Sequence, residues 1–287
     1  MKIPFTKMHG LGNSYIYLDL FQFDIEEGLL ADIAIEASNV YTGIGSDGII
    51  LIHPSDVADV GMRIFNKDGS EGQSCGNGLR CVAKYAYDFG IIDRKNFRIE
   101  TKANVVEAEV IIEDNVVNDV TINMGAPQLV RSNVPMLGED SEQVVAEHFE
   151  VNGEQLSVTA VSMGNPHAVF FVEAIENAPL HELGPIIEKD QRFPSGVNVE
   201  FIEVISNEEL NFRVWERGSG ITQACGTGAC AAVVAAILND RVSRNEDIVV
   251  HLQGGDLVIK WDDLGEVWMT GGASIIASGT FHFDSQK

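Results

Sequence analysis

The sequence predicts an α+β protein made of two homologous, pseudo-symmetric halves, each with a mostly antiparallel or mixed β-sheet wrapped around a central helix. The first indication is an internal repeat: residues 62–79 (MRIFNKDGSEGQSCGNGL) align without a gap with residues 212–229 (FRVWERGSGITQACGTGA), 150 positions later. The second is an upstream echo, in which Gly12-Asn13 matches Gly164-Asn165 at an offset of 152. Two matches in the same order indicate a duplicated domain rather than a solenoid.

The strands of both halves follow one order around this repeat. Each half begins with a short strand, a Gly-Asn pair and a second strand; an apolar helix, two more strands and a Gly-rich turn follow. β-branched and aromatic residues between turn signals indicate strands. The strands expected in chain order are residues 15–20, 48–53 and 62–66 in the first half, and 168–172, 197–204 and 212–216 in the second.

A helix is expected directly after each cysteine of the repeat. Gly90 is placed to end the first of these helices. The second, Ala229–Leu238, is apolar all round and is therefore expected to be buried. The apolar residues that recur at helical spacing in the first helix are Leu79, Val82, Ala83 and Ala86.

Hairpin strands are expected after each helix, with turns at Glu113-Asp114-Asn115 and Gly254-Gly255-Asp256. Gln128–His148 has no counterpart in the other half and is expected to carry the link between the halves. Ser274–Phe283 is expected to return as a strand to the first half. The expected halves are residues 1–127 plus 274–287, carrying Cys75, and residues 128–273, carrying Cys225.

The composition is that of a folded, strongly acidic protein. The chain has 287 residues, 45% of them hydrophobic, which is enough for a sizeable core and excludes a disordered protein. It has 19 Lys and Arg against 43 Asp and Glu, a formal net charge of −24. Such a surface repels phosphate backbones and anionic membranes, so neither nucleic acid nor a membrane is an expected partner.

The cysteines are expected to be reduced in a cytoplasmic protein. The start, MKIPFTKMHG, has no apolar core of a secretory signal. The longest uncharged apolar run has ten residues, well short of the ~18 that indicate a membrane span. Four cysteines are too few for a disulfide scaffold, and cytoplasmic thiols stay reduced.

Cys75 and Cys225 each stand where a strand meets a helix N-terminus, just before Gly-x-Gly. The first N–H groups of a helix lack internal partners, so they can bind a carboxylate, and they lower the pKa of a nearby thiol. Two such turns facing one small molecule could remove a proton from one face of a carbon and deliver one to the other. Read singly, each could be an ordinary buried cysteine; the matched repetition favours chemistry.

The remaining cysteines, Cys81 and Cys230, fall within apolar helix faces and are expected to be small core residues. No pair of short Cys-x-x-Cys type or paired histidine ligands is present, so no metal site is expected.

The motifs around the cysteines resemble those of the diaminopimelate epimerase family, in the same order and over nearly the whole chain. The resemblance implies a cofactor-independent isomerase that interconverts LL- and meso-2,6-diaminopimelate in lysine and peptidoglycan precursor biosynthesis, with a homodimer as its assembly. The motifs are MHGLGN (8–13), GIGSDG (43–48), FNKDGSE (65–71), SCGNG (74–78), SMGNPH (162–167), VNVEF (197–201), ERGSG (216–220) and ACGTGAC (224–230).

The resemblance also implies roles for single residues. Cys75 and Cys225 are the two acid/base groups, and His167 and Glu216 modulate their ionisation. The backbone amides expected to hold the reacting carboxylate are those of Gly76, Asn77, Gly226 and Thr227. The side chains expected to contact the amino and distal carboxylate groups of the substrate are Asn13, Asn66, Asn165, Asn198, Glu216 and Arg217.

Two positions depart from the family pattern. Gly48 stands where the family often has Gln, so one side-chain contact is expected to be missing or replaced by water. Ala277 stands at the place of a tyrosine that contacts the partner in the family's dimer.

Each supporting residue also has a plain structural interpretation. Arg217 and Glu216 can be surface neighbours, and His167 can be a loop or core residue. The asparagines can be turn residues that tolerate left-handed geometry. Against this, an amino acid with a second carboxylate needs a fixed cation, and Arg suits carboxylate geometry.

Two alternative functions stay open from the sequence. One is a racemase or epimerase of the same fold that acts on proline or hydroxyproline. The other is a non-catalytic, redox-sensing binding protein that closes through a Cys75–Cys225 disulfide. A small-molecule substrate is the partner expected of the enzyme.

Overall fold

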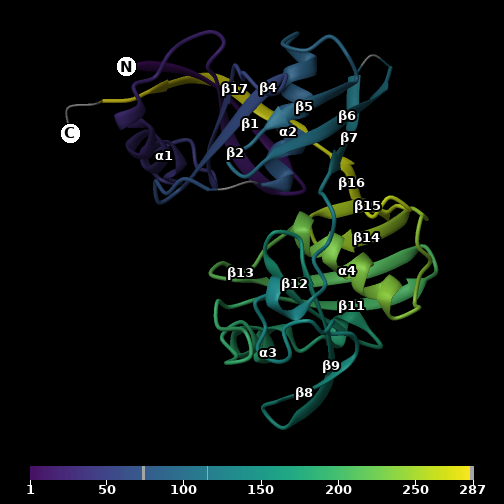
Figure 1. The fold of residues 1–287 in the computed structure, drawn as a ribbon. Helices are drawn as coiled ribbons and strands as arrows, with labels where there is room; N and C mark the ends of the chain where they lie inside the picture. The colour runs from purple at the N-terminus through teal and green to yellow at the C-terminus, as the bar shows by residue number, and fades with distance from the viewer. Residues whose placement is uncertain (73–74, 115, 285–287) are drawn as a thin grey trace. The chain divides into compact units, whose positions relative to one another are not determined.

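The computed structural model describes residues 1–72, 75–114 and 116–284, and the chain forms two compact units (Figure 1). Unit 1 comprises Met1–Ile122 and Gly271–Lys287, and unit 2 comprises Asn123–Thr270. Asn115 of the expected turn, and Gln73 and Ser74 of the first cysteine motif, lie outside the described residues.

Unit 1 is built from strands with two helices. Its elements in chain order are β1 (Lys2–Gly10), β2 (Asn13–Asp19), the 3-10 turn η1 (Glu27–Leu29), α1 (Leu30–Ser38), β3 (Gly48–His53), β4 (Val60–Asn66), α2 (Gly76–Asp88), β5 (Asn96–Glu100), β6 (Val105–Glu113), β7 (Val116–Asn123) and β17 (Ser274–His282).

Unit 2 is likewise built from strands with two α-helices. In chain order they are η2 (Arg131–Asn133), β8 (Glu147–Val151), β9 (Glu154–Ser162), β10 (Pro166–Phe171), η3 (Ile175–Asn177), α3 (Leu180–Ile187), β11 (Asn198–Ser206), β12 (Glu209–Glu216), β13 (Gly220–Ile221), α4 (Gly226–Leu238), β14 (Ile248–Leu252), β15 (Gly255–Trp261) and β16 (Val267–Gly272), whose last residues pass into unit 1.

The strand pairing repeats between the units. In unit 1, β2 and β3 are parallel, β3 and β4 antiparallel, and β4 and β5 parallel across α2. In unit 2, β10 and β11, β11 and β12, and β12 and β14 across α4 pair in the same three ways. The register repeats too, since Ile49 faces Phe65 as Val199 faces Trp215. The prediction of two homologous α+β halves is confirmed.

The predicted elements are present, with ends that differ by up to three residues. Residues 48–53 are β3 itself. Gly90 follows α2 in the left-handed region, at φ +72°, and its N–H bonds the Tyr87 carbonyl, so it ends the helix as expected. One turn was placed late: Gly255 and Asp256 already belong to β15, because both continue the ladder with β14.

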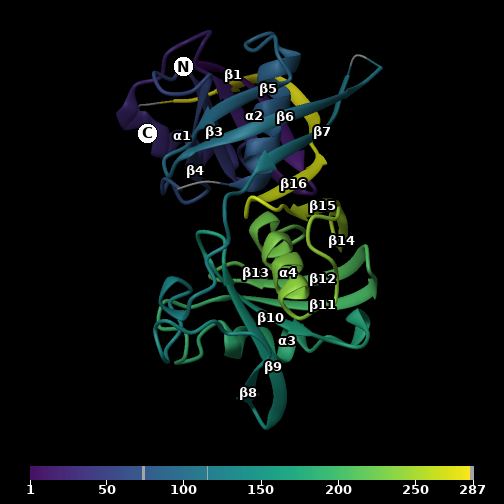
Figure 2. The same ribbon diagram turned by 45° about the vertical axis from the view of Figure 1, so that its right-hand side comes forward.

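The two central helices are buried, as their sequences predict. Every residue from Asn77 to Ala86 of α2 is buried, and α4 is buried from Gly228 to Ala236. Figure 2 draws α2 and α4 as the helices among the strands of unit 1 and of unit 2. The side chains of Cys81 and Cys230 are fully buried within these helices, which confirms that they are core residues. Each helix therefore begins at a cysteine and runs into a core.

Each unit has its own hydrophobic core. In unit 1, α1 packs on β3 through residues such as Ile33, Ile49 and Leu51. In unit 2, Phe149 and Phe170 make an edge-to-face pair at 5.4 Å between centroids, and Phe201 stacks on Phe170. Burying a side chain of this size contributes roughly 1.5–3 kcal/mol, so these clusters hold β8–β11 together.

The last strand of the chain returns to unit 1, whereas the segment Gln128–His148 belongs to unit 2. β17 pairs antiparallel with β1 from Lys2–His282 to His9–Ser274, which confirms the predicted return strand, drawn yellow beside purple in Figure 1. Gln128–His148 lies wholly within unit 2, which begins at Asn123, so the prediction that this segment carries the link between the halves is wrong. It contains η2 and the start of β8, and isolated bridges join Gln128 to Ser162 of β9 and Val130 to Gln143 within the segment.

Gly48 is required by the backbone. Its φ is +154°, and a Cβ at this position would lie 2.1 Å from the carbonyl oxygen of Phe65 on the paired strand β4. A side chain here would push β3 away from β4. The absence of the family's frequent Gln is therefore accompanied by a local backbone that leaves no room for one.

We predict that Gly48→Ala lowers the free energy of unfolding by about 1–3 kcal/mol, because the new methyl group overlaps a backbone oxygen that cannot turn away. Urea unfolding followed by circular dichroism measures this. Gly28→Ala is the matched control: Gly28 is exposed and its Cβ would meet nothing within 4 Å, so its change stays within about 0.5 kcal/mol. Equal stability of the two variants would contradict the packing argument.

Candidate active site

Cys75 and Cys225 occupy the same structural position in the two units. Each is the N-cap residue of a central helix, with extended backbone angles (φ −148°, ψ 112° and φ −121°, ψ 105°). The cap position directs the side chain toward the first N–H groups of the helix, which have no intrahelical acceptor. Each sulfur therefore lies at the positive end of a helix dipole.

In unit 1 the Cys75 thiol is held by Asn13, the first residue of β2, and by the start of α2. It donates to Asn13 Oδ1 at 3.6 Å, and the Gly78 N–H donates to the sulfur at 3.4 Å. Asn77 Nδ2 donates to the same Asn13 oxygen at 3.4 Å. Cys75 is half-buried, so a small molecule can reach it.

Asp47 and Arg80 orient the asparagines around Cys75. Asp47 Oδ2 accepts from Asn13 Nδ2 at 2.9 Å, which turns the amide oxygen toward the cysteine. Arg80 is fully buried and donates to Asn77 Oδ1 at 2.9 Å. Neither residue was among the predicted site residues, although Asp47 lies in the GIGSDG motif.

Tyr15 is the ionisable neighbour of this cysteine. Burial, followed by the charges of Cys75 and Asp47, raises the pKa of Tyr15 above its ordinary range. Tyr15 therefore remains a neutral phenol at physiological pH.

In unit 2 the Cys225 thiol is more deeply buried, with 6% of its surface exposed. Burial, followed by the charges of Glu216 and Glu200, raises the pKa of Cys225 well above its usual value. The Thr227 hydroxyl, 3.6 Å from the sulfur, acts in the opposite direction. The predicted lowering of the thiol pKa by the helix end is wrong for Cys225, because desolvation of the thiolate outweighs the helix N-terminus.

His167 and Asn165 continue from Thr227 into the interior. Asn165 Nδ2 donates to Thr227 Oγ1 at 3.2 Å, and Asn165 Oδ1 lies 3.0 Å from His167 Nε2. His167 Nδ1 lies 2.6 Å from Glu200 Oε1, and both side chains are fully buried. His167 is thus a core residue that also reaches the cysteine through two intermediates.

The side chains expected to bind the distal end of the substrate have different surroundings. Arg217 is exposed, and its Nη1 donates to the Ser195 carbonyl at 2.9 Å. Glu216 accepts from the Thr222 hydroxyl. Asn66 is half-buried, and its Nδ2 donates to Ser70 Oγ at 3.1 Å.

Asn198 is a buried residue that shapes the loop before Arg217. Its Nδ2 donates to the Pro166 carbonyl at 3.0 Å, and its Oδ1 accepts from the Arg217 N–H at 2.8 Å. Both ends of this amide are used within the protein, so Asn198 can act on a ligand through the position of Arg217.

Glu200 is the residue of this region that sequence reasoning missed. The signal was present in the repeat, because position 200 aligns with Ile50 at the offset of 150. Within the apolar segment VNVEF (197–201), Glu200 replaces the apolar residue of the other half, which indicates a buried carboxylate.

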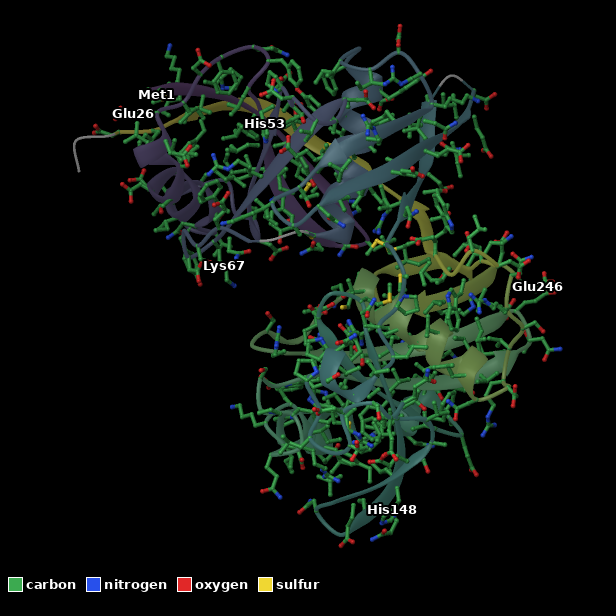
Figure 3. All side chains as sticks on the ribbon, viewed as in Figure 1. Met1, Glu26, His53, Lys67, His148 and Glu246 are labelled. Carbon is green, nitrogen blue, oxygen red and sulfur yellow. The ribbon has the colours of Figure 1, made fainter. Side chains whose placement is uncertain are left out.

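The histidines without a predicted role lie on other elements. Figure 3 labels His53, at the end of β3, and His148, on the β8–β9 hairpin.

Among residues 1–72, 75–114 and 116–284, no three His, Cys, Asp or Glu side chains are grouped so as to hold a metal ion. No helix in the described part of the chain is long and apolar enough to cross a membrane.

The sequence of this chain matches those of a known protein family. The sequence profile described as "Diaminopimelate epimerase" matches residues 5–130 and 159–276. The chain is 66% identical over 286 residues to the diaminopimelate epimerase of Oceanobacillus iheyensis, with 100% of both chains covered. It is 60% identical over 277 residues to that of Bacillus subtilis, covering 96% of this chain and 98% of the relative.

Solved structures at low identity share the fold. A Bacillus anthracis phenazine biosynthesis protein of the PhzF family has a TM-score of 0.74 at 16% identity, with 99% of this chain and 100% of the other covered. A hydroxyproline epimerase from Agrobacterium vitis has a TM-score of 0.68 at 16% identity, with 100% and 92% covered. Together with the full-length relatives, the matched profile shows that this chain belongs to the diaminopimelate epimerase family.

Proposed function

We propose that this protein interconverts LL- and meso-2,6-diaminopimelate without a cofactor, in the biosynthesis of lysine and peptidoglycan precursors. The observation that carries the proposal is the repeated position of Cys75 and Cys225, each the N-cap of a buried helix in a member of this family. We propose the halves 1–127 with 274–287 and 128–273 as the two parts of the catalytic unit.

The two thiols act on opposite faces of one α-carbon. Cys225 holds its proton at neutral pH, because its pKa is raised by burial and by Glu216 and Glu200, so it is the acid of the resting protein. Cys75 as thiolate then removes the α-proton, and Cys225 delivers its proton from the other side. The reaction leaves Cys75 as thiol and Cys225 as thiolate, which is the starting state for the opposite direction.

The weak acidity of the α-carbon is the main obstacle, since no cofactor supplies an electron sink. Charge that develops on the substrate carboxylate is met by the backbone N–H groups of Gly76-Asn77 and Gly226-Thr227 at the helix starts. Hydrogen bonds to charged groups contribute about 1.5–3 kcal/mol each, so four make up a useful part of the lowering of the barrier. Their value increases where water is excluded.

The rest of the substrate is held by polar side chains near the cysteines. Arg217 binds the distal carboxylate, and its backbone is set by Asn198. Glu216 tunes the ionisation of Cys225 through its charge. The amides proposed to contact the amino and carboxylate groups are those of Asn13, Asn66 and Asn165.

The relatives favour diaminopimelate over a cyclic substrate. The proteins that are 59–66% identical over nearly the whole chain bear the name diaminopimelate epimerase. The hydroxyproline epimerase is related at 16%, a level that supports the shared fold alone. A redox-sensing binding protein would not exchange the α-hydrogen, so the same assay separates it from an enzyme.

We predict that LL-diaminopimelate in D2O yields meso product with deuterium at the inverted α-carbon, because a solvent-exchanged thiol supplies the new hydrogen. Cys75→Ser or Cys225→Ser lowers kcat by roughly 10²–10⁴-fold, since serine is too weak an acid and base for the step. Mass spectrometry and chiral chromatography follow the reaction.

Cys230→Ala is the matched control for this experiment, because Cys230 is a buried core residue of the same helix as Thr227. It retains near-normal turnover. Turnover of proline or hydroxyproline in place of diaminopimelate, or normal turnover by either serine variant, would overturn the proposal.

We predict that the alkylation rate of Cys225 stays low at pH 7–8 and rises only above the ordinary thiol range. Glu216→Gln removes a negative charge that disfavours the thiolate, so it lowers the pKa of Cys225 and raises the rate at fixed pH. Iodoacetamide labelling with mass spectrometry of the Cys225 peptide measures this. Glu209→Gln, at the exposed far end of the same strand, leaves the rate unchanged; a shift there would show an unspecific charge effect.

We also propose a cytoplasmic homodimer. The four cysteines are thiols rather than disulfides, as the chemistry requires and the cytoplasm permits. β17 pairs with β1, and its residues Ser274–Thr280 are exposed in an unbroken row. Ile275 and Ile276 are 44% and 49% exposed. An exposed strand with apolar side chains is a surface suited to a second copy.

We predict that Ile276→Glu converts a dimer into a monomer, because it places a charge in the centre of the proposed contact. Sedimentation equilibrium measures the mass. Val57→Glu, an equally apolar exposed position in a loop of the same unit, leaves the assembly unchanged. A wild-type protein that sediments as a 31.2 kDa monomer would contradict the dimer.

A further inference from the structure

A buried carboxylate distinguishes unit 2 from unit 1 at one position of the repeat. Glu200 on β11 is fully buried, and its equivalent on β3 is Ile50, also fully buried. A Cβ on Gly78 would meet Ile50 Cδ1 at 2.7 Å, and one on Gly228 would meet Glu200 Oε1 at 3.1 Å. The fold therefore accepts an apolar side chain here, and the carboxylate needs another explanation.

Glu200 is costly to bury in this way. Its Oε1 lies 2.6 Å from His167 Nδ1, but its Oε2 has no hydrogen-bond partner among the described residues. An unpaired buried oxygen is destabilising, and the isoleucine of unit 1 avoids this cost. Burial raises the pKa of Glu200, so this carboxyl group takes up a proton more readily than a solvated one.

A continuous row of polar contacts leads from Glu200 to the catalytic sulfur. It runs from His167 Nε2 to Asn165 Oδ1 (3.0 Å), from Asn165 Nδ2 to Thr227 Oγ1 (3.2 Å), and from Thr227 Oγ1 to Cys225 Sγ (3.6 Å). All four residues and Glu200 belong to unit 2.

The direction of these hydrogen bonds follows from the donors. An amide oxygen only accepts, so with Asn165 Oδ1 facing His167 the Nε2 atom carries a proton. Asn165 Nδ2 then donates to Thr227, which leaves the Thr227 hydroxyl hydrogen for the sulfur. A sulfur that accepts this hydrogen is stabilised as the thiolate.

The opposite direction is reached when the Glu200–His167 pair holds one proton instead of two. The remaining proton lies on Nδ1, against the carboxylate, so Nε2 can only accept. The Asn165 amide turns over, its Nδ2 donates to Nε2, and its Oδ1 accepts from the Thr227 hydroxyl. Thr227 Oγ1 is then free to accept from the Cys225 thiol, which is favoured.

We propose that Glu200 is a positioning residue for the reaction: together with His167 it sets the direction of the hydrogen bonds through Asn165 and Thr227, and thereby the protonation state favoured at Cys225. The consequence for catalysis rests on the proposed function, since an epimerase needs Cys225 as thiol in one direction and as thiolate in the other. The coupling between Glu200 and Cys225 is independent of substrate.

The charges around the row are few. Glu216 on β12 is the other charged group that acts on both Cys225 and Glu200. α4 carries no charged residue from Gly226 to Leu238. β14 and β15 also pack against α4, and their titratable groups are half-buried or exposed. His251 of β14 pairs with Asp256 of β15, and Lys260 of β15 pairs with Asp247, just before β14.

The test compares Glu200→Gln in two backgrounds without substrate. The amide that replaces the carboxyl group can donate to Nδ1 as the protonated acid does, but it cannot lose that proton, so the row keeps the direction that favours the thiolate. We expect the pKa of Cys225, measured by the pH dependence of alkylation at the Cys225 peptide, to fall by about one unit. Thr227→Val removes the hydroxyl group that links Asn165 to the sulfur. In that background we expect the Glu200→Gln shift to be less than half of the shift seen when Thr227 is present.

The loss of a charge acting directly through space would give the same shift in both backgrounds, and that result, or no shift at all, overturns the proposal. Glu203→Gln, three residues along the same strand, is the matched control and leaves Cys225 unchanged. Thermal unfolding establishes that each variant is folded. Because no turnover is measured, failure of the epimerase assay and failure of this titration are separate results.

A measurement on the unaltered chain decides the matter if the Glu200→Gln substitution prevents folding. ¹⁵N-labelled histidine reports which ring nitrogen of His167 carries a proton. As the pH is raised, we expect Nε2 to lose its proton, which leaves the proton shared with Glu200 on Nδ1. Loss from Nδ1 first, or an Nε2 that stays protonated until the protein unfolds, contradicts the proposal.

Discussion

The constraint on which this structure depends is the placement of a cysteine at the first, unsatisfied turn of a buried helix. Each cysteine has extended backbone angles, and the helix that follows it runs directly into the core. Gly78 and Gly228 allow this, because the space that a Cβ would take is filled by residue 50 or residue 200. The same geometry that packs the helix therefore exposes its N–H groups beside a sulfur.

The two halves share a backbone plan but differ in the chemistry around the sulfur. In unit 1 the neighbours of Cys75 are Asn13, Asn77 and a phenol, Tyr15. In unit 2 a threonine, an asparagine and a histidine occupy the corresponding places, with a carboxylate behind them. The side chains around the sulfur differ between the halves, so the two thiols have different environments although their backbone positions correspond.

Burial explains why the pKa of Cys225 is raised rather than lowered. A helix N-terminus stabilises a thiolate by about 0.3–1 kcal/mol when it is solvated, and up to about 2 kcal/mol in partly buried sites. Desolvation of a fully enclosed thiolate costs more, and the nearby carboxylates Glu216 and Glu200 add to it. This balance keeps the Cys225 thiol protonated at neutral pH.

The sequence alone determined the duplicated architecture, the strand order and the two cysteine turns, because these depend on local patterns: a repeat at one offset, apolar periodicity, and glycines at turns. Cys75, Cys225 and the family resemblance were accessible for the same reason. The pairing of Glu200 with His167, the role of Asp47 behind Asn13, the internal use of Asn198 and the raised pKa of Cys225 were decided by the tertiary structure. Each depends on which side chains from distant segments meet and on how much water they lose, and neither quantity is written in local spacing.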